Sequence, residues 1–225
     1  MLTFTEENYI KAIYALTHSA GVEHANTNQL SLRLNNKAAS VSDMLQRLFE
    51  KKLIDYKKYH GVKLTKKGLS TAIQIVRKHR LWEVFLVEKL NFKWDEVHEI
   101  AEQLEHVHSD ELIKRLDKFL NFPKHDPHGD PIPDMKGIVH EIKQIELNKC
   151  KIKEKAIFSG VKSHTKEFLQ HISKLGLSLG ERIELVDRSE FDGLLEIKIG
   201  SSKKTIHIGH KTAENILVEV LWASR

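Results

Sequence analysis

The 225-residue sequence predicts a mainly α protein with a small β domain at its C-terminal end, and three observations lead to this class. Apolar residues recur at helical spacing up to about residue 120. All four prolines lie within 121–137, which must therefore be an extended loop. From about residue 156, apolar and polar residues alternate in short segments between glycines, as in a small antiparallel barrel or sandwich.

Residues 1–70 carry the pattern of a winged helix-turn-helix. A polar turn at 35–38 joins two of its helices, and "LIDYKKYHGVKLT" (53–65) alternates like a two-stranded wing. These 70 residues contain eleven Lys and Arg against six Asp and Glu, whereas the rest of the chain has twenty-five of each. Such a basic segment is typical of nucleic-acid-binding modules. Helices are expected over 5–18, 28–34 and 39–52, the first two with Thr5 and Thr27 as N-caps.

The middle of the chain is expected to be helical as far as the proline-rich loop. Thr65 opens a long helix over 66–90, and two shorter helices follow over 94–107 and 109–120. A lysine-rich connector with helical character then leads to the β domain. The expected parts are a winged helix-turn-helix at 1–70, a helical domain at 71–137, the connector at 138–155 and the β domain at 156–225.

Composition limits the class of protein. No run of eighteen apolar residues occurs, so neither a membrane span nor a membrane partner is expected. The N-terminal segment lacks the basic region and cleavage site of a signal peptide. Cys150 is the single cysteine, which excludes an intramolecular disulfide and a zinc site with several thiolates. We therefore expect a cytoplasmic protein.

The stretch "HEIAEQLEHVH" (98–108) holds three histidines and three glutamates but no lysine or arginine. Residues at i, i+4, i+7 and i+8 share one face of a helix. Either this is an acidic, solvated face, or these side chains converge on a cation. Nitrogen and oxygen donors without thiolate favour Mn²⁺, Fe²⁺, Co²⁺, Ni²⁺ or Zn²⁺, and preference for Mn²⁺ grows with the carboxylate share. The residues with this spacing are His98, Glu102, Glu105 and His106, and the preceding helix adds His79 and Glu83 one turn apart.

Catalytic alternatives have weaker support in the sequence. A di-iron carboxylate oxidase needs Glu-x-x-His pairs from two helices, and only Glu105–His108 has that spacing. The HExxH pattern of metalloproteases, the P-loop and the dinucleotide fingerprint are absent. The cluster is therefore expected to be regulatory, and the protein is not expected to be an enzyme or to have a small-molecule substrate. A metal-binding adaptor without operator specificity is a further alternative.

Six motifs in order carry a resemblance to a known family. They are "EENYIKAIYAL" (6–16), "SVSDMLQRLFEKKLI" (40–54), "GVKLTKKG" (61–68), "RKHRLWEVFL" (77–86), "EVHEIAEQLEHVHSDEL" (96–112) and "FPKHDPHGDPIP" (122–133). Together they resemble the diphtheria-toxin-repressor family of metal-dependent transcription regulators over about residues 3–135. The segment from about 156 to 225 is similar to the C-terminal SH3-like β-barrel of its manganese-responsive members.

The resemblance implies a homodimer that binds double-stranded operator DNA. In this family a winged helix-turn-helix binds palindromic operators, a helical domain dimerises and holds Fe²⁺ or Mn²⁺ as corepressor, and metal-uptake genes are repressed. Two metal ions per subunit are implied. The primary site would use Asn8, Glu102, Glu105 and His106, and the ancillary site His79, Glu83 and His98. Asp126, His128 and Glu167 match further ligand positions of the streptococcal-type manganese members, with His164 as an additional candidate.

Three departures from the family pattern bear on the metal. Glu102 stands where iron-responsive members have Cys, which favours Mn²⁺, with Fe²⁺ as the alternative. Asn8 stands where manganese-responsive members have Asp, and its neutral amide should weaken the site. Lys11 stands where the short manganese regulators have Glu, so a closely spaced pair of metal ions is not expected.

DNA contacts are expected from the second helix of the helix-turn-helix and from the wing. Serine, lysine and arginine near a recognition-helix N-terminus suit phosphates or base edges, and an alanine suits a thymine methyl. Simple helix capping is the alternative for the serines. The expected contacts are Lys37, Ala39, Ser40, Ser42 and Arg47 from the helix, and Lys57, Lys58 and Lys63 from the wing.

Overall fold

The computed structural model describes residues 2–19, 21, 23–57, 60–139, 143–200 and 204–221. It divides into two compact units. Unit 1 comprises Met1–His79, Glu102–Ile113 and Pro133–Ile138, and unit 2 comprises Arg80–Ala101, Lys114–Ile132 and Val139–Arg225. Among the described residues, no helix is both long and apolar enough to cross a membrane.

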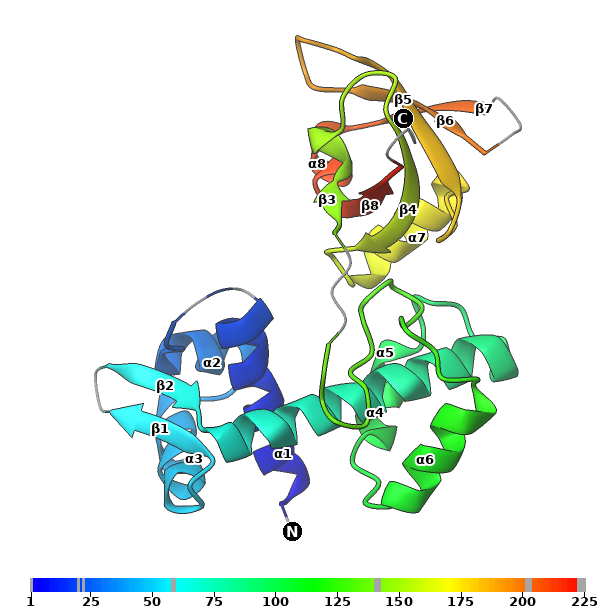
Figure 1. Cartoon of the computed structure of the whole chain (residues 1–225). Coiled ribbons are helices and arrows are strands. Elements are labelled where there is room, and N and C mark those ends of the chain that lie inside the picture. The colour runs from blue at the N-terminus through cyan, green and yellow to red at the C-terminus, as the bar shows by residue number, and fades with distance from the viewer. Residues whose placement is uncertain are drawn as a thin grey trace. The chain divides into compact units, whose positions relative to one another are not determined.

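Unit 1 contains the predicted winged helix-turn-helix, with three helices and a hairpin around one apolar core (Figure 1). Tyr9, Ile10 and Ile13 from the first helix pack with Leu45 and Leu48 from the third. This is the apolar spacing that predicted the helices. The elements are α1 (Phe4–Tyr14) with a π-helical turn η1 (Ala15–Ser19), α2 (Thr27–Leu34), α3 (Ala38–Glu50), β1 (Ile54–Lys57) and β2 (Gly61–Leu64).

The helix caps differ from those predicted. Thr3, not Thr5, caps α1, because its hydroxyl accepts from the Glu6 amide while the Glu6 carboxylate accepts from the Thr3 amide. Asn26, not Thr27, caps α2 through the same exchange with Gln29. A capping residue three positions before a Glu or Gln takes part in two such hydrogen bonds. It is therefore favoured as the N-cap over a neighbouring residue that would form one.

The wing is joined to the loop before α2. Ala25 and Val62 exchange two backbone hydrogen bonds of 2.8 and 2.9 Å. Gly61 has a φ of +91°, and a Cβ there would lie 2.8 Å from the Ala25 carbonyl oxygen. Only glycine allows both this backbone conformation and this close approach.

Helix α4 (Lys66–Leu90) has the predicted bounds, and the Thr65 hydroxyl accepts from the Gly68 amide at its start. Helix α6 (Asp110–Phe119) also agrees with the prediction. Helix α5 (His98–Leu104) is shorter than the predicted 94–107. The Val107 amide bonds to the Leu104 carbonyl and closes a turn, so Glu105 and His106 lie beyond the helix end.

The β-structured part of unit 2 is one antiparallel sheet in the order β3-β8-β4-β5-β6-β7 (Figure 1). Phe158, Leu185, Ile197 and Val218 are buried at its core. Its strands are β3 (Ile145–Glu146), β4 (Lys155–Val161), β5 (Arg182–Arg188), β6 (Leu195–Ile199), β7 (Lys204–Ile208) and β8 (Ile216–Val220).

Two features of this part were not predicted. The expected helical character of the connector is wrong for its described residues, since β3 pairs with β8 and one 3-10 turn, η2 (Leu147–Lys149), follows. Helix α7 (Lys166–Leu175) buries Leu169 and Ile172 against the strands, and α8 (His210–Ala213) precedes β8. The pairing of β3 with β8 is a long-range contact that local sequence patterns do not reveal, whereas α7 carries local signals in its apolar spacing and in Gly176 at its C-cap.

Candidate metal centres

The first candidate centre lies in unit 1, where α1 faces the turn that follows α5. The His106 ring is nearly buried, and its Nε2 lies 3.0 Å from Asn8 Oδ1 and 3.7 Å from Glu105 Oε1. These three residues belong to the predicted primary site. The tertiary structure therefore brings Asn8 to His106 although 98 positions separate them in the chain.

Glu7 is a functional candidate that the sequence analysis missed. Its Oε2 lies 2.5 Å from His106 Nδ1, and its side chain is buried. A carboxylate that accepts from one ring nitrogen orients the imidazole and leaves the other nitrogen for a ligand. Glu7 thus directs His106 Nε2 toward Asn8. The only signal in the sequence was its position next to Asn8.

Lys11 supplies a cation to the same place. Its ammonium lies 2.7 Å from Glu105 Oε1, 2.9 Å from Glu105 Oε2 and 3.2 Å from Glu102 Oε1. His79 Nδ1 lies 2.6 Å from Glu105 Oε2. Burial raises the pKa of the Glu105 carboxyl, but the His79 hydrogen bond and the charge of Lys11 outweigh it and hold the pKa below its ordinary value.

The donors of this first centre do not surround an open position. Glu102, Glu105 and His106 are not among the described groups of three donors whose ligand atoms all lie within 4.8 Å of one another. The Lys11 ammonium lies between the two carboxylates instead. This arrangement does not fit a divalent ion at Glu102 and Glu105 unless Lys11 moves away, because two cations would then share the same oxygens.

The second candidate centre lies in unit 2 and consists of Glu83, Asp126 and His128. One ligand atom of each lies within 4.8 Å of the others, and all three side chains are buried. His128 Nε2 donates to the Trp94 carbonyl oxygen at 2.9 Å. Its Nδ1 then faces Glu83 Oε2 at 3.5 Å and Asp126 Oδ1 at 3.8 Å, without a hydrogen bond. A histidine held through one nitrogen, with the other directed at carboxylates, has the geometry of a metal ligand.

Backbone contacts fix the loop that carries Asp126 and His128. Asp126 Oδ1 accepts from the amides of His128 and Asp130 at 2.7 and 3.0 Å. The Val161 amide of β4 donates to the His128 carbonyl oxygen at 3.0 Å. Gly129 has a φ of +91°, and a Cβ there would lie 2.1 Å from the Ser159 carbonyl oxygen. The loop can pack this closely on β4 only with glycine at this position.

The electrostatics of the second centre favour an added cation. Burial, Asp130 and Glu83 raise the pKa of Asp126 to about 7, and the charges of His128 and of Arg80, which is 3.7 Å away, offset this only in part. Burial by itself lowers the pKa of His128, but Glu83 and Asp126 raise it to about 9. Buried carboxylates that repel one another are relieved by a bound divalent ion. Two carboxylates and one imidazole without thiolate form a donor set that Mn²⁺ accepts.

Some of the other predicted ligands lie next to the group of Glu83, Asp126 and His128. His98 Nδ1 is 3.5 Å from Glu83 Oε1, and the His164 ring stacks on His128 with centroids 4.8 Å apart. Glu167 is exposed in the first turn of α7 and is not in the described donor group, so its role stays a prediction. The joining of His79, from unit 1, with Glu83 and His98 also stays a prediction.

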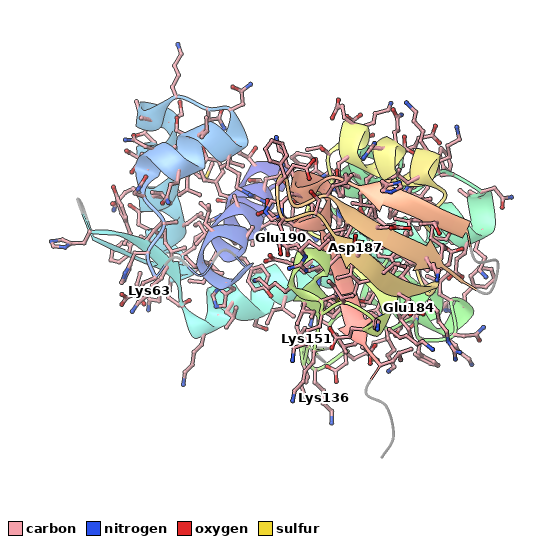
Figure 2. All side chains as sticks on the ribbon, turned by 90° about the horizontal axis from the view of Figure 1, so that it is seen from above. Lys63, Lys136, Lys151, Glu184, Asp187 and Glu190 are labelled. Atoms are coloured by element: carbon pink, nitrogen blue, oxygen red, sulfur yellow. The ribbon has the colours of Figure 1, made fainter. Side chains whose placement is uncertain are left out.

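The candidate DNA-binding residues are largely accessible. Ala39, Ser40 and Arg47 are exposed on α3, whose Val41, Leu45 and Leu48 are buried, and Lys37 is exposed at its N-cap. Ser42 is half-buried, and its hydroxyl donates to the Ala38 carbonyl oxygen one turn earlier in α3 at 3.0 Å, which is not a capping bond. Lys63 is exposed on β2 (Figure 2). The side chain of Lys57 and the whole of Lys58 lie outside the described residues.

Three family models match the chain in order. They are the iron dependent repressor N-terminal DNA binding domain over residues 1–62, the iron dependent repressor metal binding and dimerisation domain over 65–134, and the FeoA domain over 145–220. The last match begins at β3, in agreement with the sheet.

Curated relatives and solved structures agree with these models. The iron-dependent repressor IdeR of Mycobacterium tuberculosis is 32% identical over 173 residues, which cover 76% of this chain and 74% of that protein. The HTH-type transcriptional regulator MntR of Oceanobacillus iheyensis is 32% identical over 64% of this chain and 95% of its own length. A solved manganese-dependent transcriptional repressor in complex with manganese is 34% identical, with a TM-score of 0.84, covering 96% of this chain and all of that one.

Proposed function

Since the chain belongs to the iron-dependent repressor family of metal-dependent transcriptional regulators, we propose that it represses metal-uptake genes when Mn²⁺ is bound. Fe²⁺ is the alternative effector. The family's members are regulators of transcription, and we assign no catalytic activity to this chain. Because such a regulator acts on genomic DNA, the proposed location is the cytoplasm.

The observation that carries the proposal is the buried group Glu83, Asp126 and His128 within the region matched by the metal binding and dimerisation model. Its oxygen-rich donor set supports Mn²⁺. A bound divalent ion would supply positive charge that relieves the repulsion of the carboxylates. Within unit 2, Glu83 belongs to α4, and Asp126 and His128 belong to the loop packed on β4. These residues would therefore hold helix, loop and sheet in one arrangement when the centre is loaded.

Operator binding is proposed to use a homodimer. Leu90, Phe119 and Phe122 of unit 2 are more than half exposed, and a group of exposed large apolar side chains supports association with another copy. A dimer presents two recognition helices, which read half-sites one DNA turn or a multiple apart. The exposed Lys37 at the N-cap of α3, Arg47 of α3 and Lys63 of the wing suit the phosphates that position such a protein.

The test is DNA binding with and without metal. An operator selected from random double-stranded DNA in the presence of Mn²⁺ is titrated with the full chain in Mn²⁺, in Fe²⁺ under anaerobic conditions, and in chelator. We expect binding in metal only, and Glu83→Gln should remove it. Glu99→Gln changes an exposed glutamate of α5 and serves as the matched control. Equal operator binding in chelator would overturn the proposal.

A further inference from the structure

Lys11 is the one lysine of α1, and its ammonium is bound by three carboxylate oxygens. Two of them belong to Glu105, at 2.7 and 2.9 Å, and the third belongs to Glu102, at 3.2 Å. A side chain of α1 thereby holds the turn after α5 from within unit 1. The contact joins residues 91 and 94 positions apart in the chain.

Burial makes this contact different from a surface ion pair. The Glu105 side chain has no exposed area, and Lys11 is 21% exposed. A buried carboxylate needs a compensating charge, and an ion pair that loses one partner leaves the other uncompensated. Lys11 and His79 together provide this compensation for Glu105. Metal is therefore not needed to stabilise this carboxylate.

The position of the ammonium also limits what else these oxygens can bind. A divalent ion shared by Glu102 and Glu105 would sit within a few ångströms of the nitrogen, where two positive charges repel strongly. The ammonium must swing out before the ion can enter. Asn8, whose side-chain oxygen faces His106 Nε2, is neutral and adds no charge that would favour the ion over the lysine.

We infer that Lys11 is a resident cation of the first centre, which joins α1 to the turn after α5 without metal and excludes a tightly bound divalent ion from Glu102 and Glu105. This inference rests on the proposed function and refines it, since the metal response of the repressor then depends on the second centre. The first centre then links α1 to the turn after α5 whether or not metal is present. The subunit would bind one metal ion tightly, whereas the family resemblance implied two.

The first test counts metal ions. Metal-free full-length protein and its Lys11→Met variant are titrated with Mn²⁺ in a calorimeter. The wild type should bind one tight equivalent, which Glu83→Gln removes. Lys11→Met should gain a second site, with affinity raised at least about tenfold by loss of the repelling charge. Glu102→Gln in the Lys11→Met background should remove that second site.

Two variants control for effects unrelated to the cation. Lys136→Met changes an exposed lysine of unit 1 (Figure 2) and should leave the titration unchanged. Lys11→Arg keeps the charge and should also bind one equivalent. Two tight equivalents in the wild type, with one lost in Glu102→Gln, would overturn the inference, as would a Lys11→Met variant that gains no site.

The second test detects the link itself and remains informative if the metal titration of Lys11→Met is disturbed by altered folding. Amide hydrogen exchange is measured in chelator for wild type, Lys11→Arg and Lys11→Met. Exchange in α1 and in residues 102–107 should rise together in Lys11→Met and stay near wild type in Lys11→Arg. Unchanged exchange in Lys11→Met would contradict the link.

The two proposals fail in distinguishable ways. If operator binding needs Mn²⁺ and Glu83 while Lys11→Met gains no site, the inference about Lys11 is wrong and the proposed function stands. If Lys11→Met gains a Mn²⁺ site but no form of the protein binds operator DNA, the proposed function is wrong and the resident cation stands.

Discussion

The two candidate metal centres are built from the same kinds of side chain but differ in how their negative charge is balanced. In the first, Lys11 and His79 contact Glu105, and the pKa of this carboxyl lies below its ordinary value. In the second, burial and the charges of Asp130 and Glu83 raise the pKa of Asp126 to about 7, and the charges of His128 and Arg80 offset this only in part. Donor residues alone therefore do not make a metal site. The neighbouring charges decide which carboxylates still need a cation.

The largest expected effect concerns the stability of the first centre without metal. Glu105→Gln leaves Lys11 with only the half-exposed Glu102 and should lower the free energy of unfolding by about 3–5 kcal/mol. Glu102→Gln should cost less than about 1 kcal/mol, because its pair with the same lysine is open to solvent. Urea unfolding in chelator, followed by circular dichroism, measures both. Equal losses would remove the distinction between the buried and the exposed partner.

The next effect concerns metal affinity at the second centre. Glu83→Gln should weaken Mn²⁺ binding more than about 100-fold, since even loss of a residue that only orients a ligand costs about 10–100-fold. Glu102→Gln in the wild-type background should change it by less than about threefold, because Lys11 already satisfies that carboxylate. Calorimetric titration compares the two, with Glu99→Gln as the control. A larger loss in Glu102→Gln would reverse the assignment of the two centres.

A smaller effect is the pH dependence of the metal-free protein. Folding raises the pKa of Asp126 from 3.8 to about 7, so the folded state binds more protons in that window and stability falls as pH rises through it. The raised pKa of His128 stabilises the protein below pH 6.5, and this contribution is lost as pH rises through about 9. Both signs agree.

Thermal unfolding in chelator checks this pH dependence. Tm should fall by at least about 4 °C from pH 5 to pH 9. In Asp126→Asn the fall should be smaller. Saturating Mn²⁺ should reduce or reverse it, because metal binding displaces the protons that the site holds at low pH. A Tm that is flat in chelator, or that rises with pH through this window, would contradict the raised pKa values.

The smallest effect separates loss of metal response from loss of DNA contact. Lys63→Gln should weaken operator binding modestly, reduce the salt dependence by about one phosphate contact, and leave Mn²⁺ affinity unchanged. Ser42→Ala should change neither operator binding nor Mn²⁺ affinity, because the Ser42 hydroxyl already bonds within α3. Operator titrations at several salt concentrations test both variants. A change in Mn²⁺ affinity in Lys63→Gln would mean that DNA-binding variants cannot report on the centres independently.

Much of the fold and part of each site followed from local patterns. Helical spacing of apolar residues gave α1, α3, α4 and α6, because the face of a helix that packs on a core repeats every 3.6 residues. The basic charge of the first seventy residues and the proline-rich loop led to the predicted domain bounds, which stay a prediction. The helix bounds of α5 were wrong, since a turn closes at Leu104 and the predicted face of four ligands therefore ends with Glu102.

By itself, the sequence determined the family, the order of the elements and the pool of candidate ligands, because these depend on residue type and local spacing. The partners of these ligands depend on how the chain folds. The tertiary structure brought Glu7 to His106, placed Lys11 beside Glu102 and Glu105, and placed Glu83, Asp126 and His128 together, where the pKa of Asp126 is raised. The physical reason is that electrostatic balance depends on distance in space, and local sequence patterns do not record which distant residues come within a few ångströms of one another.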